Sequence, residues 1–270
     1  MTTYKLALIV FVLFFNLSCY TQNNLKLKAD LPNALNEVSG TETILGSELI
    51  WMLNDKGNAA KLFGVDKNGR IMKELIIDVK NNDWEDLTSD FEGNIYIGDF
   101  GNNNKDRKKF TVYKISQPET VNIKTTAVQI NFSLPKGIKS KDFEAFFIYH
   151  DTFYIFSKEK EKSILVKVPN IKGNHLAEVI AEFNLDEKDN RITSADISED
   201  GKTIILLNHN KIWIPTDFKK DDFFNGTITS LKFNHSSQKE GVCFKGKKML
   251  LITDEKSEGV GGNLYEFEID

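Results

Sequence analysis

Five oxygen-bearing side chains recur through the sequence at spacings that could bring them to one metal ion. Each stands at the start of a short apolar segment, and successive members are 46, 59, 50 and 46 residues apart. The five are Ser39, Glu85, Glu144, Ser194 and Glu240. Carboxylates and hydroxyls are ligands for calcium, which accepts about six to eight oxygens in loose geometry. The pattern therefore predicts a Ca²⁺ site if the fold brings the five together.

Two other interpretations bear on this metal hypothesis. Three carboxylates in one space repel each other, so without a cation either a pKa must rise or water must fill the space. A polar lining that holds only water is thus the alternative to calcium. Zinc is not expected, because the four His and two Cys of the chain form no cluster in the sequence.

A second polar residue follows each of these positions by 14 or 15 residues, at the end of the next apolar segment. Asp and Asn favour tight turns, so these residues are either plain turn residues or contacts for a ligand. His209 could act as a general acid or base, or it could be an ordinary exposed loop histidine. We predict that a rim of ligand-binding residues comprises Asn54, Asp55, Asp99, Lys158, Asn208, His209 and Asp254.

The stretch NDWEDLTSDFEGNIYIGDFGNN, residues 82–103, contains one member of each set. Glu85 opens its first strand-like segment and Asp99 ends the second. Because Glu85 has counterparts elsewhere in the chain, it is the preferred metal ligand. Asp83 and Asp86 have no such counterparts and are expected to be solvated or turn-forming.

The elements that must position these residues repeat five times. In each repeat a first strand is followed by a turn and by a second strand rich in β-branched, aromatic and aliphatic residues. The second strands are LIWML, IYIG, FYIFS, TIILL and MLLIT. Third strands follow in all five repeats and fourth strands in four. We expect an all-β, five-bladed β-propeller of four-stranded antiparallel blades over residues 24–270.

The fifth repeat ends at the C-terminus after its third strand. The segment LKLKADL, residues 25–31, alternates apolar and polar residues and precedes the first repeat. We predict that this N-terminal strand completes the last blade, which would leave no large exposed sheet edge. A β-sandwich is the alternative, but it would not group its strands in five sets with a common start.

The first 22 residues are predicted to be a signal peptide. Lys5 precedes an apolar run, Leu6 to Phe15, that is too short to span a bilayer. Lipidation at Cys19 and cleavage near Thr21 or Gln22 are both compatible with the sequence. The protein is therefore expected to be exported, either lipid-anchored at the outer membrane or soluble in the periplasm or medium. Cys243 then has no disulfide partner and is expected to be a small buried residue.

Composition limits the partners of the protein. The chain has 270 residues, 40% hydrophobic and 27% charged, with a net charge of −4 and no clustered basic face. Nucleic acid is therefore not an expected partner. We expect a monomer that binds a small molecule or a protein at the channel mouth and meets membranes only through an N-terminal lipid.

The last three repeats resemble a known family. FEAFFIYHDTFYIFSKEKEKSILVKV, TSADISEDGKTIILLNH and QKEGVCFKGKKMLLITDE are similar to the SdiA-regulated family of exported five-bladed propellers. The order Ser, Glu, Glu, Ser, Glu also resembles the calcium-activated nucleotidases, whose matching ring holds calcium. The resemblance implies a metal role for this ring, but the basic substrate-binding residues of the nucleotidases have no clear match beyond Lys158.

Three functions follow from these patterns. The preferred hypothesis is a calcium-binding propeller that acts as a binding or scaffold module at the cell envelope. The alternative is a calcium-dependent phosphoesterase, like a nucleotidase or phytase, in which the ion orients water and Asp99, Asp254 or His209 is the base. A propeller that handles sugars or lactones is the third.

Overall fold

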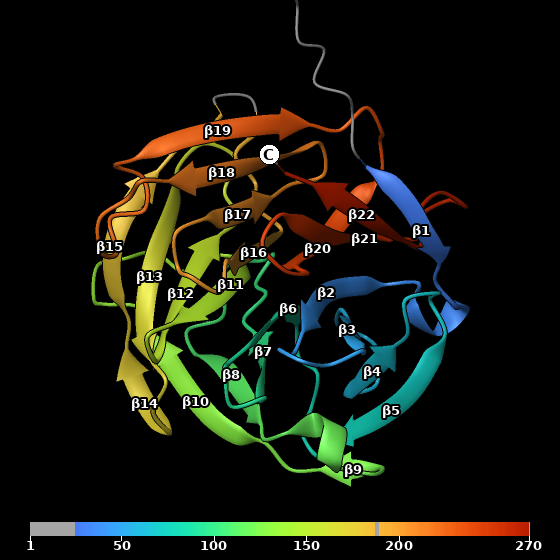
Figure 1. Cartoon of the computed structure of the whole chain (residues 1–270). Helices are drawn as coiled ribbons and strands as arrows, with labels where there is room; N and C mark the ends of the chain where they lie inside the picture. Colours follow the sequence, from blue (N-terminus) through green and yellow to red (C-terminus); the bar gives the residue numbers. More distant parts are fainter. Residues whose placement is uncertain (1–24, 187–188, 270) are drawn as a thin grey trace, which may run out of the picture.

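The protein is a ring of five small β-sheets, as predicted (Figure 1). The computed structural model describes residues 25–186 and 189–269. Within them the helical content is two short 3-10 turns, η1 (Asn33–Leu35) and η2 (Pro118–Thr120). The all-β class and the five-bladed architecture are therefore confirmed.

The first two blades each contain four antiparallel strands in chain order, from the channel outward. Blade 1 consists of β2 (Val38–Thr43), β3 (Ile50–Asn54), β4 (Lys61–Val65) and β5 (Ile71–Ile77). Blade 2 consists of β6 (Trp84–Ser89), β7 (Ile95–Asp99), β8 (Phe110–Ile115) and β10 (Val128–Ser133). A fifth strand lies parallel to the outer strand of each, β9 (Lys124–Thr125) in blade 1 and β14 (Gly173–Leu176) in blade 2. The sequence pattern did not predict these two additions.

Blades 3 and 4 follow the same plan with four strands each. Blade 3 consists of β11 (Phe143–Tyr149), β12 (Thr152–Ser157), β13 (Ser163–Pro169) and β15 (Glu178–Phe183). Blade 4 consists of β16 (Ser194–Ile197), β17 (Ile204–Leu207), β18 (Lys211–Thr216) and β19 (Thr227–Lys232).

Blade 5 is closed by the N-terminal strand, as predicted. It consists of β20 (Gln238–Phe244), β21 (Met249–Glu255), β22 (Asn263–Glu268) and β1 (Lys26–Asp30). β1 pairs antiparallel with β22 on the outside of the ring, where Figure 1 shows these first and last strands side by side.

The core is divided among the five seams between neighbouring blades, and each seam holds one apolar cluster. The seam between blades 2 and 3 is rich in Phe, and Phe143 packs edge-to-face on Phe110 at a centroid distance of 5.2 Å. Such pairs stabilise beyond their buried area. Cys243 is a free thiol buried in the seam between blades 5 and 1, as expected.

The innermost strands β2, β6, β11, β16 and β20 surround the channel axis (Figure 1). In four of them the pairing with the second strand shifts by one residue near the strand start. Such a bulge leaves one residue unpaired and redirects its side chain. These bulges position the candidate site.

Candidate functional site

Four of the five predicted ring residues are the unpaired residues of these bulges. They are Ser39, Glu85, Glu144 and Glu240, with exposed fractions between 3% and 7%. Because the first strands contact one another around the axis, the bulges bring these side chains to one mouth of the channel.

Blade 4 differs from the predicted pattern. Ser194 pairs with Leu207, as Gly40 of β2 pairs with Leu53, so it lies one position beyond the bulge. The residue at the ring position is Thr193, whose N–H donates to Leu207 O. The ring position of blade 4 therefore belongs to the neighbour of the residue that the spacing selected.

The two hydroxyl members of the ring connect adjacent blades. Ser39 Oγ donates to Trp84 O at 3.3 Å, and Thr193 Oγ1 donates to Lys239 O at 2.9 Å. Both hydroxyl hydrogens are therefore bonded within the protein, while the hydroxyl oxygens keep lone pairs that can accept a hydrogen bond or contact a cation.

Lys158 provides a positive charge inside the ring of carboxylates. Its Nζ lies 3.0 Å from Glu144 Oε2, and its side chain is largely buried. Burial alone would lower the pKa of this amine, but the charges of Glu144, Glu240 and Glu85 raise it above its usual value. Lys158 therefore neutralises part of the carboxylate charge that, from the sequence, a calcium ion was expected to neutralise.

The three ring glutamates titrate differently. Burial raises the pKa of Glu144 to about 8 although Lys158 opposes the rise. Burial and the charge of Glu144 also raise the pKa of Glu85. Burial acts in the same direction on Glu240, but Lys158 and His209 outweigh it and lower its pKa. His209 Nε2 lies 3.0 Å from Glu240 Oε1. Of the three glutamates, Glu240 therefore favours its ionised form, while Glu85 and Glu144 favour their protonated forms.

Three carboxylates meet beside Glu85. Asp55, Asp83 and Glu85 each offer one oxygen, and these oxygens all lie within 4.8 Å of one another. Burial raises the pKa of Asp55 to about 6, and the charge of Asp83 adds to the rise. Lys56 Nζ lies 3.1 Å from Asp83 Oδ1. Asp83 is 7% exposed and forms an ion pair, so the expectation that it is solvated is wrong.

Gly101 allows two carboxylates of this cluster to lie against the backbone. A Cβ at this position would lie 1.8 Å from Glu85 Oε1 and 2.6 Å from the carboxyl carbon of Asp83. No side chain fits there, so only glycine keeps both carboxylates in place. Part of the glycine and asparagine run after Asp99 is explained in this way.

The predicted rim divides into two groups. Asp55, Lys158 and His209 lie beside the ring, as described above. The other four are 7% exposed or less and bond within the protein. Asn54 Nδ2 donates to Ala34 O, and Asn208 Oδ1 accepts from Lys211 N–H.

Two buried acids of the predicted rim brace loops behind the site. Asp99 Oδ1 accepts from Arg107 Nη2 at 2.8 Å, and Asp254 accepts from Asn263 N–H and from the Tyr265 hydroxyl, each at 2.8 Å. Neither offers a free base at the mouth of the channel.

Asp86 is the main residue that sequence reasoning missed, since it is buried with no exposed surface rather than solvated. Its carboxylate accepts from the N–H groups of Leu87, Phe146 and Ala195 and from Ser194 Oγ, so it joins blades 2, 3 and 4. Burial raises its pKa above the usual range despite these bonds. The sequence did contain a sign of this role. An acid stands at this position in blade 2, whereas the equivalent positions in the other blades carry Gly, Ala or Ser.

Residues 1–22, with the predicted signal peptide and Cys19, lie outside the described residues. Among residues 25–186 and 189–269, no helix has the length and apolar character needed to cross a membrane.

Comparison with known proteins supports the fold alone. No family model matches the sequence, and no curated protein matches it. The PQQ-bound aldose sugar dehydrogenase of Streptomyces coelicolor superposes with a TM-score of 0.54 at 10% identity, over 91% of this chain and 98% of that one.

Two other solved structures are similar with lower scores. A chain of a nidogen/laminin complex gives a TM-score of 0.49 at 11% identity, over 80% of this chain and 72% of that one. The hydrazine synthase of Kuenenia stuttgartiensis gives 0.45 at 12% identity, over 89% of this chain and 59% of that one, so this chain spans less than two thirds of it. Membership of the SdiA-regulated family stays a prediction, and nothing in these similarities favours the phosphoesterase alternative. The chain is a five-bladed β-propeller with distant propeller neighbours.

Proposed function

We propose that the protein is a calcium-binding module whose ion is held at the channel mouth by Asp55, Asp83 and Glu85. The observation that carries this proposal is the approach of three carboxylate oxygens to within 4.8 Å of one another. Carboxylates are hard oxygen ligands, and calcium tolerates the irregular geometry of a site built from two blades.

The donor set fits a divalent cation in two further respects. The raised pKa values of Asp55 and Glu85 reflect burial together with nearby negative charge, and a bound cation would relieve both. Gly101 has no side chain to displace Glu85 and Asp83, so both carboxylates stay at the cluster. The proposed ion is held by these three acids rather than by the five ring residues, because Lys158 already pairs with Glu144 in the ring.

The biological setting of this proposal rests on the signal peptide predicted from the sequence. We propose that the protein is exported by its N-terminal segment and works at the cell envelope as a binding or scaffold module. Ligand contacts are then expected at the mouth that carries Asp55, Lys158 and His209.

Thermal unfolding with and without calcium tests the cation site. Calcium should raise the Tm of the wild-type protein and a chelator should lower it, because binding to the folded state alone stabilises it. Asp83→Asn and Glu85→Gln should each remove most of this response. The matched control Glu48→Gln neutralises an exposed acid elsewhere in blade 1 and should keep it. A wild-type Tm that does not change with calcium would sink the proposal.

A further inference from the structure

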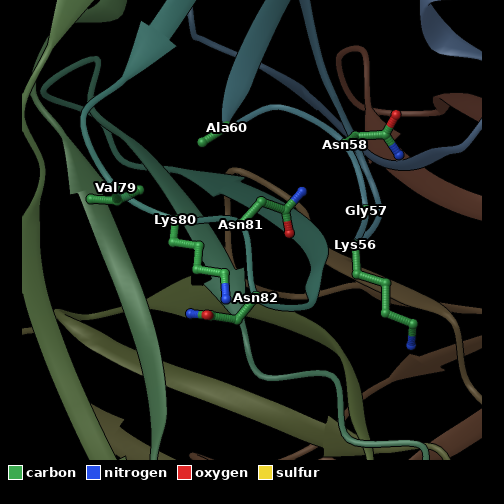
Figure 2. Close-up of a pocket in the computed structure, with 8 residues that line it drawn as sticks. All are labelled: Lys56, Gly57, Asn58, Ala60, Val79, Lys80, Asn81 and Asn82. Carbon is green, nitrogen blue, oxygen red and sulfur yellow. The ribbon is translucent and has the colours of Figure 1, made fainter.

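A groove lies beside the cation site, at the seam between blades 1 and 2. The loop that connects β3 to β4 forms one wall, and the connection from β5 to β6 forms the other (Figure 2). Its volume is about 610 Å³, within the range of small-molecule sites. The lining residues are Lys56, Gly57, Asn58, Ala60, Val79, Lys80, Asn81 and Asn82.

The charge of this lining is opposite to that of the protein. The chain carries a net charge of −4, but the groove is lined by two lysines and no acid. Asn81 and Asn82 lie between Lys80 and Lys56 in Figure 2. Within the described residues Lys80 forms no ion pair or hydrogen bond, so its ammonium is available to an anion.

The amides of the groove are held in place by the protein. Asn81 Nδ2 donates to Asn54 O and Asp55 O, while its Oδ1 accepts from Trp84 N–H. Asn82 Nδ2 donates to Asp99 Oδ2, which is itself buried. A wall that is fixed in this way needs little reordering when a ligand binds.

Two amide oxygens remain open for hydrogen bonds. Asn58 Nδ2 donates to Asp55 O, but among the described residues no donor bonds to Asn58 Oδ1 or Asn82 Oδ1. Amide oxygens accept hydrogen bonds from hydroxyl groups. The combination of free acceptors with a free ammonium indicates a hydroxylated molecule that carries an acidic group.

Lys56 links the groove to the cation site. It lines the groove, yet its Nζ is bound to Asp83, one of the three carboxylates. A cation on Asp83 would compete with this ammonium and release it. The freed Lys56 would then add a second unpaired positive charge to the groove.

We propose that the groove binds an acidic sugar, of monosaccharide or disaccharide size, and that its affinity for this ligand rises when calcium binds. The second part rests on the calcium site proposed above. Coupling between the two sites is reciprocal, so the acidic sugar would also increase the affinity for calcium.

Calorimetric titration with three probes tests the groove. Glucuronate or glucose 6-phosphate should bind to the wild-type protein, and the tighter of the two identifies a carboxylate or a phosphate as the acidic group. Neutral glucose should not bind. Lys80→Met should weaken binding by about tenfold, as expected for one charge-assisted hydrogen bond. The control Lys136→Met removes the same charge from the connection between β10 and β11 and should have no effect.

The same titrations with calcium and with a chelator test the coupling. Wild-type affinity for the acidic sugar should be several-fold higher in calcium. Lys56→Met should abolish this difference and should tighten calcium binding, because the competing ammonium is gone. Equal binding of charged and neutral sugars, no binding of either, or equal behaviour of the Lys80 and Lys136 variants would overturn the groove proposal.

Failure of each proposal is distinguishable. If calcium raises the Tm but neither acidic sugar binds, the groove proposal is wrong and the cation site stands. If an acidic sugar binds through Lys80 but calcium has no effect on the Tm, the cation site and the coupling are wrong and the anion groove stands.

Discussion

At the scale of single residues, the channel is organised by Asp86. A buried carboxylate is costly unless hydrogen bonds replace its lost hydration. Asp86 receives bonds from three backbone N–H groups and one hydroxyl, which belong to strands of three blades. The same bonds satisfy N–H groups that the curved channel lining leaves without strand partners. Asp86 and its donors therefore depend on one another.

We expect Asp86→Ala to reduce the free energy of unfolding by at least about 3 kcal/mol, because each buried N–H left without an acceptor costs about 1–3 kcal/mol. Urea unfolding followed by fluorescence measures the change. Asp66→Ala is the matched control, since Asp66 also accepts from two backbone N–H groups but lies on the surface, where water replaces it. Equal losses in the two variants would contradict the central role of Asp86.

At the scale of elements, the strands could be predicted from the sequence but their bulges could not. Apolar segments and turns mark the five blades, and β1 was correctly assigned to blade 5. A bulge inserts one residue without a change of composition. Thr193 and Ser194 are adjacent hydroxyl residues, so residue type could not choose between them. Asp55 and Asp83 join Glu85 only through the folding of loops, which strand spacing does not describe.

The closure of the ring by β1 gives a prediction at this scale. A chain shortened to begin at Leu31 loses the pairing of β1 with β22. At about 1 kcal/mol per hydrogen bond, the free energy of unfolding should fall by a few kcal/mol. The exposed edge of β22 should also promote association between copies.

Thermal unfolding and light scattering during size-exclusion chromatography measure the two effects. A chain that begins at Leu25 retains β1 and is the control. A shortened chain that is as stable and as monomeric as this control would show that the pairing of β1 with β22 does not stabilise the ring.

At the scale of the whole molecule, acidic groups are buried along the channel as well as at its mouth. Asp196 Oδ2 accepts from Phe244 N–H at 2.7 Å and Oδ1 accepts from Ile197 N–H at 2.7 Å. Burial nevertheless raises the pKa of Asp196 from 3.8 to about 7. Glu42, whose pKa is raised by burial and then by Asp196, lies in the same channel. The propeller thus keeps acids near its axis that prefer to be protonated in the folded state.

This burial makes the stability of the protein depend on pH. An acid whose pKa is higher in the folded state binds more protons there, so its contribution is present below pH 3.8 and is lost as the pH rises through about 7. In chelator, the Tm of the wild-type protein should therefore fall between about pH 5 and pH 8. Asp196→Asn, which cannot ionise, should reduce the accompanying fall in the free energy of unfolding by an amount on the order of a few kcal/mol.

Asp90→Asn separates this effect from a general loss of acidic charge. Asn94 and Tyr96 outweigh burial and lower the pKa of Asp90, so its contribution is lost as the pH falls rather than as it rises. The Asp90 variant should keep the wild-type slope between about pH 5 and pH 8 while losing stability at neutral pH. If Asp196→Asn also keeps the wild-type slope, the ionisation of Asp196 does not control this loss of stability, which contradicts the prediction.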